Sequence, residues 1–279
     1  MGETGNRVVE FYASHPISAG HILARLKTER GSLEGVAAAD LYPHDQDHYG
    51  GLAANAALAD AAGISPGAKV ADFCAGIGGP ARWMAAERGA AVTGVELTPE
   101  RVAGARELTA LVGLSERVRV LEGDVTAAPL ADGSFDAVYS QEAFLHVPDT
   151  SAVLAEACRV LRPGGRLAFT DWVANTPLSE ADADAMLQGL RAQRLNSPAE
   201  YRRLLADAGF EVLAVDDLTE PWGEILKRRL EMYLQLREDT AETGSASGDD
   251  AFYHGYVRFV ALVREGVLGG ARFTARRAG

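Results

Sequence analysis

Short apolar runs alternate with helical segments along the middle of the chain, and this alternation limits the fold more than any other feature. We expect strands at 69–73, 91–96, 118–122, 135–140, 166–170 and 211–216. Helical patterns separate most of them, at 81–88, 99–111, 151–161 and 199–208. Strand–helix–strand alternation with continuously apolar strands is typical of a parallel sheet that is covered on both faces. The sequence therefore predicts an α/β fold over about 66–218.

The N-terminal part of the chain has a different character from the alternating region. Residues 1–65 contain helical patterns at 8–12 and 17–26. Pro43 and a glycine pair interrupt the pattern within 40–51, which predicts an ordered loop there. We expect residues 1–65 to form a helical lid segment before a ligand-binding domain that spans 66–279.

The C-terminal part adds two insertions to this domain. They cover 175–196 and 219–265, and we expect both to form part of a substrate pocket. The second insertion contains a helical pattern at 225–236 and a polar stretch at 238–250 that is typical of a solvated loop. A final apolar run at 271–275 predicts a seventh strand.

The charge balance excludes several classes of partner. The formal net charge is −12, from 27 basic and 39 acidic residues, so the chain has no general attraction for nucleic acid or for an anionic membrane. Cys74 and Cys158 are too few for a disulfide scaffold or a structural zinc site of their own. The polar N-terminus and the absence of a long apolar run argue against a signal peptide and a membrane span. We therefore expect a cytoplasmic protein.

A glycine-rich loop follows the first expected strand. Residues 72–81 read DFCAGIGGPA, in which Gly76, Gly78 and Ala81 fit the dinucleotide pattern G-x-G-x-x-A. Glu96 ends the second strand 20 residues after Gly76, where an acid that binds a ribose belongs. No Lys-Ser or Lys-Thr pair follows the glycines, so the loop is not a P-loop. Taken alone, the pattern suits a nicotinamide cofactor as readily as any other.

Asp72 distinguishes between the cofactors that such a loop can hold. Its carboxylate ends the first strand and would repel a pyrophosphate, but it would attract an ammonium and a sulfonium. S-adenosylmethionine carries both cations and a ribose, and it has no phosphate. Glycines in the loop would let the backbone approach the methionine part closely. Asp72 therefore favours S-adenosylmethionine.

A third acid follows the third expected strand. Asp124 is placed to accept a hydrogen bond from the adenine amino group, and Leu97 and Val125 are placed to sandwich the ring. Ligands of open α/β sheets bind at the carboxyl ends of the strands. Asp72, Glu96 and Asp124 thus stand at three such ends, which indicates one shared site.

Together these residues resemble those of class I S-adenosylmethionine-dependent methyltransferases. The resemblance continues through 135–140 and through 159–167, which reads RVLRPGGRL. It implies an α/β, Rossmann-like, doubly wound and mostly parallel seven-stranded sheet with a helical N-terminal lid and insertions. It also implies S-adenosylmethionine as cofactor, S-adenosylhomocysteine as product, and cofactor contacts from Tyr49, Asp72, Ala75, Gly76, Gly78, Glu96, Leu97, Asp124, Val125 and Gln141.

Within that family, residues 140–149 resemble the sarcosine/dimethylglycine N-methyltransferases. The stretch reads SQEAFLHVPD, and residues 169–171 and 198–210 continue the likeness. Trp172 departs from the proline of that subgroup, and the segment 45–51 is peculiar to this chain. These departures leave the identity of the acceptor open, but they do not affect the expected methyl-transfer chemistry.

Three residues are candidates for catalysis. His146 titrates near neutral pH and can act as a general base. Asp171, at the end of the fifth strand, is placed to orient His146 or to hold the substrate. Glu142 lies four residues before His146, which on a helical turn would put both on one face and let Glu142 receive an ammonium. Tyr49 is a candidate to close over the cofactor, and Tyr12 is a weaker one.

Two further sets of charged or metal-ligating side chains lie in the segments expected to form the site. Arg191, Arg194 and Arg228 are candidates to bind an acceptor carboxylate. The pairs at 44–45 and 47–48 match no known ligand scheme, so we expect no metal.

The sequence predicts methyl transfer to a small-molecule acceptor, most readily to an amine nitrogen of the sarcosine or dimethylglycine kind. Transfer to oxygen or carbon of a sugar or natural product is the alternative, and the pairing of His146 with Asp171 is consistent with the oxygen case. An NAD-dependent oxidoreductase shares the glycine loop but leaves Asp72 unexplained. A non-catalytic binding module leaves the His146 segment unexplained. A homo-oligomer is compatible with the sequence.

Overall fold

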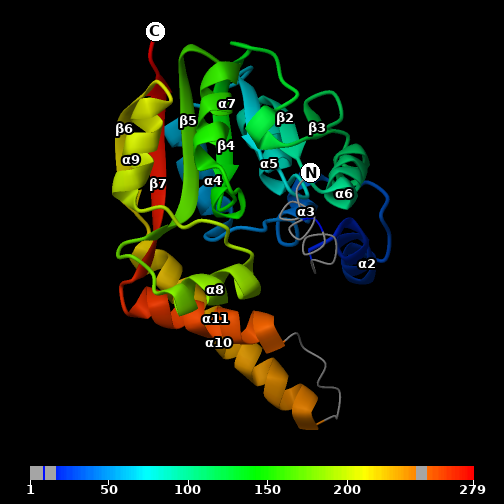
Figure 1. Cartoon of the computed structure of the whole chain (residues 1–279). Coiled ribbons are helices and arrows are strands. Elements are labelled where there is room, and N and C mark those ends of the chain that lie inside the picture. Colours follow the sequence, from blue (N-terminus) through cyan, green and yellow to red (C-terminus); the bar gives the residue numbers. More distant parts are fainter. Residues whose placement is uncertain (1–8, 10–16, 243–249) are drawn as a thin grey trace.

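The computed structural model describes residue 9, residues 17–242 and residues 250–279, and a seven-stranded sheet lies at its centre (Figure 1). The strands are β1 (Lys69–Phe73), β2 (Ala91–Glu96), β3 (Val118–Glu122), β4 (Phe135–Gln141), β5 (Leu161–Ala174), β6 (Phe210–Asp217) and β7 (Leu268–Arg277). Their order is β3-β2-β1-β4-β5-β7-β6. The pairs from β3 to β5 are parallel, and β7 is antiparallel to both β5 and β6. The predicted mostly parallel α/β sheet is confirmed.

Helices cover both faces of the sheet. One face packs against α4 (Gly51–Ala62), α5 (Gly79–Arg88) and α6 (Pro99–Leu111), and the other against α7 (Thr150–Val160) and α9 (Pro198–Asp207). Two buried apolar clusters fill these layers, as the continuously apolar strands require. Because both faces are buried, ligands can reach the sheet only at the ends of its strands.

The expected boundaries hold best where hydrophobic pattern and end signals coincide. The first three strands and α6 have the predicted limits. The runs expected at 166–170 and 271–275 are the centres of the longer β5 and β7, which pair from Arg166↔Arg276 to Ala174↔Leu268. Position 270 lies in this extension and requires glycine, because a Cβ there would lie 2.2 Å from the Trp222 ring. Such close packing is not visible as a hydrophobic period.

Before β1, the chain forms α2 (Ala19–Arg30), α3 (Ala38–Leu41) and then α4. Ile22 and Leu26 of α2 pack in one cluster with Leu108 of α6. The residues between α3 and α4 form an irregular segment, as predicted, although α4 begins already at Gly51. The helical pattern at 8–12 and the lid candidate Tyr12 lie outside the described residues, apart from residue 9, which is helical.

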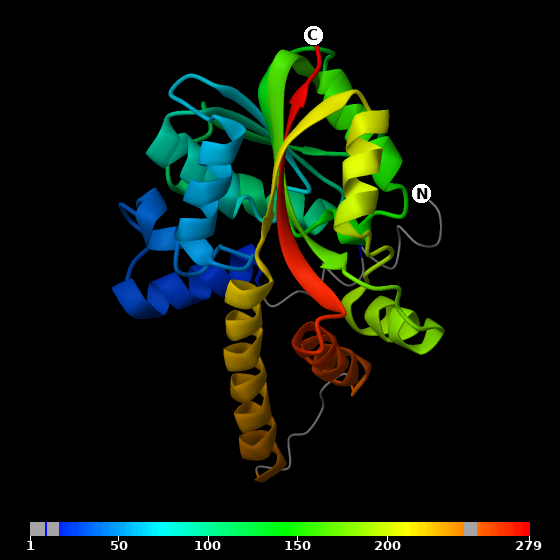
Figure 2. The same ribbon diagram turned by 90° about the vertical axis from the view of Figure 1, so that its left-hand side faces the viewer.

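The insertions form α8 (Glu180–Leu190), α10 (Thr219–Glu242) and α11 (Asp250–Arg264), which gather at one end of the sheet (Figure 1). Figure 2 shows α10 extending away from the body of the molecule. The loop expected at 238–250 is wrong for 238–242, which continue α10, and for residue 250, which begins α11, while residues 243–249 lie outside the described part. Polarity alone misleads here because glutamate and alanine favour helices. None of the helices in the described ranges is long and apolar enough to cross a membrane.

Candidate active site

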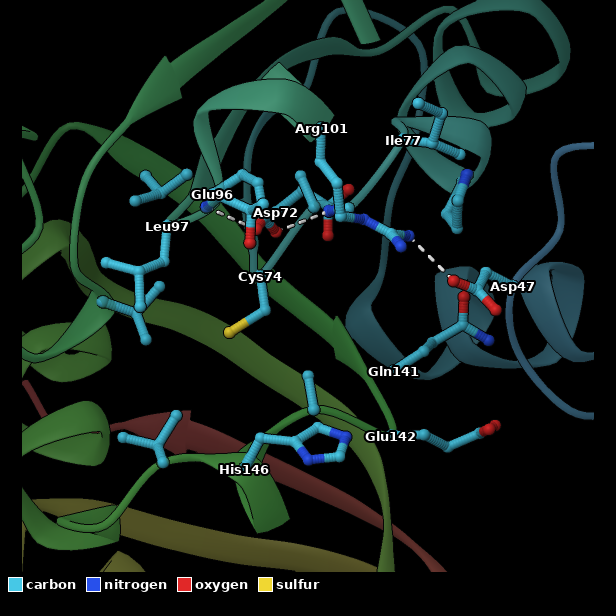
Figure 3. Close-up of a pocket in the computed structure, with 18 of the residues that line it drawn as sticks. Asp47, Asp72, Cys74, Ile77, Glu96, Leu97, Arg101, Gln141, Glu142 and His146 are labelled. Carbon is cyan, nitrogen blue, oxygen red and sulfur yellow. Dashed lines mark hydrogen bonds and ion pairs between the residues drawn. The ribbon is translucent and has the colours of Figure 1, made fainter. Parts of the chain in front are cut away.

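A cavity of about 450 Å³ opens at the carboxyl ends of β1, β2, β3 and β4. Its volume falls within the usual range for small-molecule sites. Side chains from the glycine loop, from the turns after the strands and from the segment before α4 line it (Figure 3). The topology brings together segments that are far apart in the sequence, as expected for an open α/β sheet.

The glycine loop bends sharply between β1 and α5. Cys74 and Gly76 adopt positive φ angles of 60° and 56°, and Gly78 caps α5 with a φ of 79°. Glu96 fastens this loop to β2, because its carboxylate accepts the N–H of Gly76 at 2.9 Å and that of Thr98 at 2.8 Å. Cys74, Gly76 and Glu96 line the cavity, as does the predicted contact Ala75, whereas Gly78 does not.

Asp72 presents a buried carboxyl group to this cavity. The residue is 3% exposed, and its Oδ2 atom has no hydrogen-bond partner among the described residues. Burial, and then the neighbouring Glu96, raise the pKa of Asp72 to about 8. A buried carboxyl oxygen without a partner is costly unless a ligand satisfies it, and a cation is the ligand that would do so. The residue fits an ammonium group.

The predicted adenine contacts lie together in the cavity wall. Leu97 follows β2, and Asp124 and Val125 follow β3. The carboxylate of Asp124 accepts the N–H and the hydroxyl of Thr126 at 2.8 and 2.7 Å, and so caps the short helix η1 (Val125–Ala127). The role of Asp124 toward adenine stays a prediction.

Glu142 and His146 lie beyond the end of β4. Glu142 has a φ of 53° and is not helical, and His146 ends the separate short helix η2 (Phe144–His146). The expectation that one helical face carries both is therefore wrong, because the left-handed backbone of Glu142 places it before η2 and outside any helix. Both still line the cavity, together with Gln141.

The Glu142 carboxylate is held by the segment before α4. Its two oxygens accept the backbone N–H of Tyr49 at 2.9 and 3.1 Å. Burial raises the pKa of Glu142 to about 8, although the Tyr49 hydrogen bond and Arg229 act in the opposite direction. An ammonium group bound here would favour the charged form.

His146 is held by the first insertion. Its Nδ1 atom lies 3.1 Å from the carbonyl oxygen of Arg191, which can only accept, so Nδ1 carries the hydrogen. Burial lowers the pKa of His146, which keeps the imidazole neutral and leaves the lone pair on Nε2. The N–H groups of Gln193 and Arg194 donate to Leu145 O at 2.7 and 3.1 Å. The insertion thus fixes the turn that carries His146.

Besides Gly78, two more of the predicted site residues do not line the cavity. Asp171 is fully buried and accepts the hydroxyl hydrogen of Tyr201 at 2.5 Å. Its pKa is raised to about 7 by burial, against hydrogen bonds that include the N–H of Leu145, so it supports η2. The Tyr49 ring packs against Trp172 and Trp222, with ring centroids 5.2 and 5.5 Å away. Neither Asp171 nor Tyr49 lines the cavity.

The three candidates for binding an acceptor carboxylate, Arg191, Arg194 and Arg228, do not line the cavity. Arg194 pairs with Glu200, and Arg228 is exposed on α10. Arg191 contributes its backbone carbonyl to His146. The neighbouring Arg229 instead lies 4.3 Å from the centroid of the Tyr49 ring.

Two ion pairs that sequence reasoning missed anchor the segment before α4. Arg82 of α5 donates to Asp45 at 2.9 Å, and both side chains are fully buried. Arg101 of α6 donates to Asp47 at 2.8 Å. Gly79 makes the approach possible, because a Cβ there would lie 2.0 Å from the backbone oxygen of Asp45. Charged residues in a loop and on helices are usually solvated, so these pairings had no signal in the sequence.

Comparison with known proteins identifies the class of enzyme. The methyltransferase domain family matches residues 71–169. The methyltransferase GfsG of Streptomyces halstedii is 34% identical over 209 residues, which cover 71% of this chain and 75% of that protein. The chain belongs to the S-adenosylmethionine-dependent methyltransferases. This assignment decides the choice of cofactor in favour of S-adenosylmethionine and overturns the NAD-dependent alternative.

Two further likenesses concern N-methyltransferases. The glycine/sarcosine/dimethylglycine N-methyltransferase of Actinopolyspora halophila is 36% identical over 63% of this chain and 31% of its own length. The chain therefore spans about a third of that relative. The structure of a Haemonchus contortus phosphoethanolamine N-methyltransferase with S-adenosyl-L-methionine superposes with a TM-score of 0.71 at 24% identity, over 92% of this chain and 60% of that one. This second likeness shows the shared fold.

Proposed function

We propose that the protein transfers the methyl group of S-adenosylmethionine to the nitrogen of a small-molecule amine. The observation that carries the proposal is the pairing of carboxylates with a neutral histidine at the end of β4. Glu142 and Asp47 line the cavity there beside His146. When bound, the cofactor supplies a methyl group on a sulfonium.

The carboxylates favour a cationic acceptor over a neutral one. Glu142 is half-buried in the cavity wall, where its attraction to a charge is stronger than at the surface. The charge of Asp47 raises the pKa of both Glu142 and His146, so Asp47 adds to the negative charge that these residues sense. An ammonium would bring Glu142 into its charged form and be oriented by it.

His146 accounts for the proton that an ammonium must lose before it can react. The Nε2 lone pair can accept that proton because Nδ1 donates to Arg191 and the ring is neutral. Alignment of the lone pair with the methyl group then supplies most of the rate. An amine that is already neutral needs no base.

The N-terminal segment acts as the lid of this site, and the insertions brace it. Residues 45, 47 and 48 line the cavity, whereas the described parts of α8, α10 and α11 contribute no lining residue. Trp222 and Arg229 of α10 hold the Tyr49 ring, and the Tyr49 backbone holds Glu142. The insertions at 175–196 and 219–265 therefore act on the acceptor through His146 and Tyr49.

A pH–rate profile of the wild type and His146→Ala tests the proposal, after a screen of amines, amino acids and hydroxylated metabolites has identified an acceptor. We expect the loss in turnover of His146→Ala to shrink as the pH rises, because solution hydroxide then deprotonates the amine. A pH-independent loss above about a thousandfold would favour base catalysis on oxygen instead. His44→Ala is the matched control, since His44 pairs with Glu29 away from the cavity.

A further inference from the structure

Arg101 stands out among the charged groups of the cavity. The lining includes the carboxylates of Asp45, Asp47, Asp72, Glu96, Asp124, Glu142 and Asp149. Among the described lining residues, Arg101 is the only arginine or lysine. Its guanidinium is therefore the strongest attraction that the described lining offers to the carboxylate of a ligand.

The guanidinium of Arg101 lies over the glycine loop. A Cβ placed on Gly76 would meet Arg101 Nη2 at 2.8 Å. The same loop begins at the end of β1, where Asp72 presents its carboxyl group. The ammonium and the carboxylate of an amino acid are attached to one carbon atom, so a site for both needs an acidic side chain and a cationic side chain close together. The start of the glycine loop offers that combination.

In the protein alone, Arg101 is engaged by the N-terminal segment. Its Nη2 atom donates to Asp47 Oδ2 at 2.8 Å, with the Arg101 side chain 7% exposed and that of Asp47 27% exposed. Figure 3 shows the Arg101 side chain extending across the cavity to Asp47. The pair thus joins α6 to the segment before α4.

We propose that Arg101 binds the carboxylate of the methionine part of S-adenosylmethionine, and that this carboxylate replaces Asp47 as its partner. The exchange conserves the number of ion pairs, because one carboxylate leaves the guanidinium as another arrives. An arginine can hold a carboxylate through two parallel N–H bonds, which fixes orientation as well as charge. Asp47 is then left facing Glu142 and His146 and adds a negative charge to the acceptor end. The assignment of Arg101 does not depend on which acceptor is methylated.

Calorimetry with two ligands tests the assignment without any need for turnover. S-adenosylhomocysteine keeps the carboxylate, and its decarboxylated analogue, S-adenosyl-3-thiopropylamine, lacks it. We expect Arg101→Gln to weaken binding of S-adenosylhomocysteine by ~10–100-fold, as for a lost charge-assisted hydrogen bond, and to leave the affinity of the analogue unchanged. Arg101→Lys should recover part of the loss because it restores the charge.

The pattern across ligands separates binding from folding. An equal loss for both ligands in Arg101→Gln, or no loss for either, would overturn the assignment. Arg106→Gln is the matched control on the same helix, since Arg106 donates to Val120 O outside this cavity, and it should change neither affinity.

Asp47→Asn tests the exchange itself. If Asp47 competes with the ligand carboxylate for Arg101, its removal should tighten S-adenosylhomocysteine by about 2–10-fold and leave the analogue unaffected. An unchanged or weaker affinity for S-adenosylhomocysteine in Asp47→Asn would show that no exchange occurs.

Discussion

The two ends of the cavity are built in different ways. The cofactor end takes its groups from the strand ends and turns between Asp72 and Val125, and Glu96 and Asp124 there accept backbone N–H groups of the same region. The acceptor end joins distant segments, as when Tyr49 donates to Glu142 across 93 residues of sequence. The first design uses the fold itself, whereas the second depends on how inserted elements pack onto it.

This difference implies that substitutions at the two ends should separate in their effects. A cofactor-end substitution should change the affinity for S-adenosylhomocysteine. An acceptor-end substitution should change the Michaelis constant for the acceptor and leave that affinity intact.

Substitution of Asp72 should have the largest effect. We expect Asp72→Asn to weaken S-adenosylhomocysteine by about 100-fold or more, because a buried ionic partner is lost while its mate stays charged. The pKa of Asp72 is raised to about 8 in the protein alone, so binding of an ammonium must release a proton. Wild-type affinity should therefore rise by up to about tenfold per unit between pH 6 and 7.5. Calorimetry should show this slope in the wild type, and a slope that persists in Asp72→Asn would assign it to another group.

Substitution of Glu96 should follow. The sequence predicts that Glu96 binds the ribose hydroxyls, and its carboxylate also supports the glycine loop. We expect Glu96→Ala to lose about one to two orders of magnitude in cofactor affinity. Glu122→Ala is the matched control, because Glu122 pairs with Glu96 in register and ends β3 outside the cavity. An unchanged dissociation constant in a folded Glu96→Ala variant would remove Glu96 from the site.

Substitution of Glu142 should have a smaller effect, confined to the acceptor. Glu142→Gln keeps the shape of the side chain and removes its charge. We expect the Michaelis constant of a cationic acceptor to rise by roughly tenfold, with the affinity for S-adenosylhomocysteine unchanged. Steady-state kinetics and calorimetry on the same preparation measure both quantities. A parallel loss of cofactor affinity would mean that the two ends are not independent.

The sequence predicts the cofactor end well for a physical reason. A strand, a glycine turn and a helix are determined by local pattern, and parallel pairing then brings Asp72, Glu96 and Asp124 to one edge. Their strand ends were therefore predictable residue by residue. Gly78 is the exception, since it caps α5 and does not line the cavity.

The acceptor end was predicted less completely because its contacts are tertiary. Glu142 was expected on a helical turn with His146, but its left-handed backbone breaks that turn. Tyr49 was expected over the cofactor, but Trp172 and Trp222 offer its ring a buried aromatic cluster. The Asp47–Arg101 pair joins two segments whose separation in sequence hides their contact.

The identity of the atom that receives the methyl group tests the central proposal most directly. The protein can be incubated with S-adenosylmethionine that carries a ¹³C-labelled methyl group and with an acceptor found in the screen. The carbon chemical shift and the long-range proton–carbon couplings of the product then report the atom to which the label is bonded. We expect the label on nitrogen. A label on oxygen or carbon, with the unlabelled amine recovered intact, would contradict the proposal.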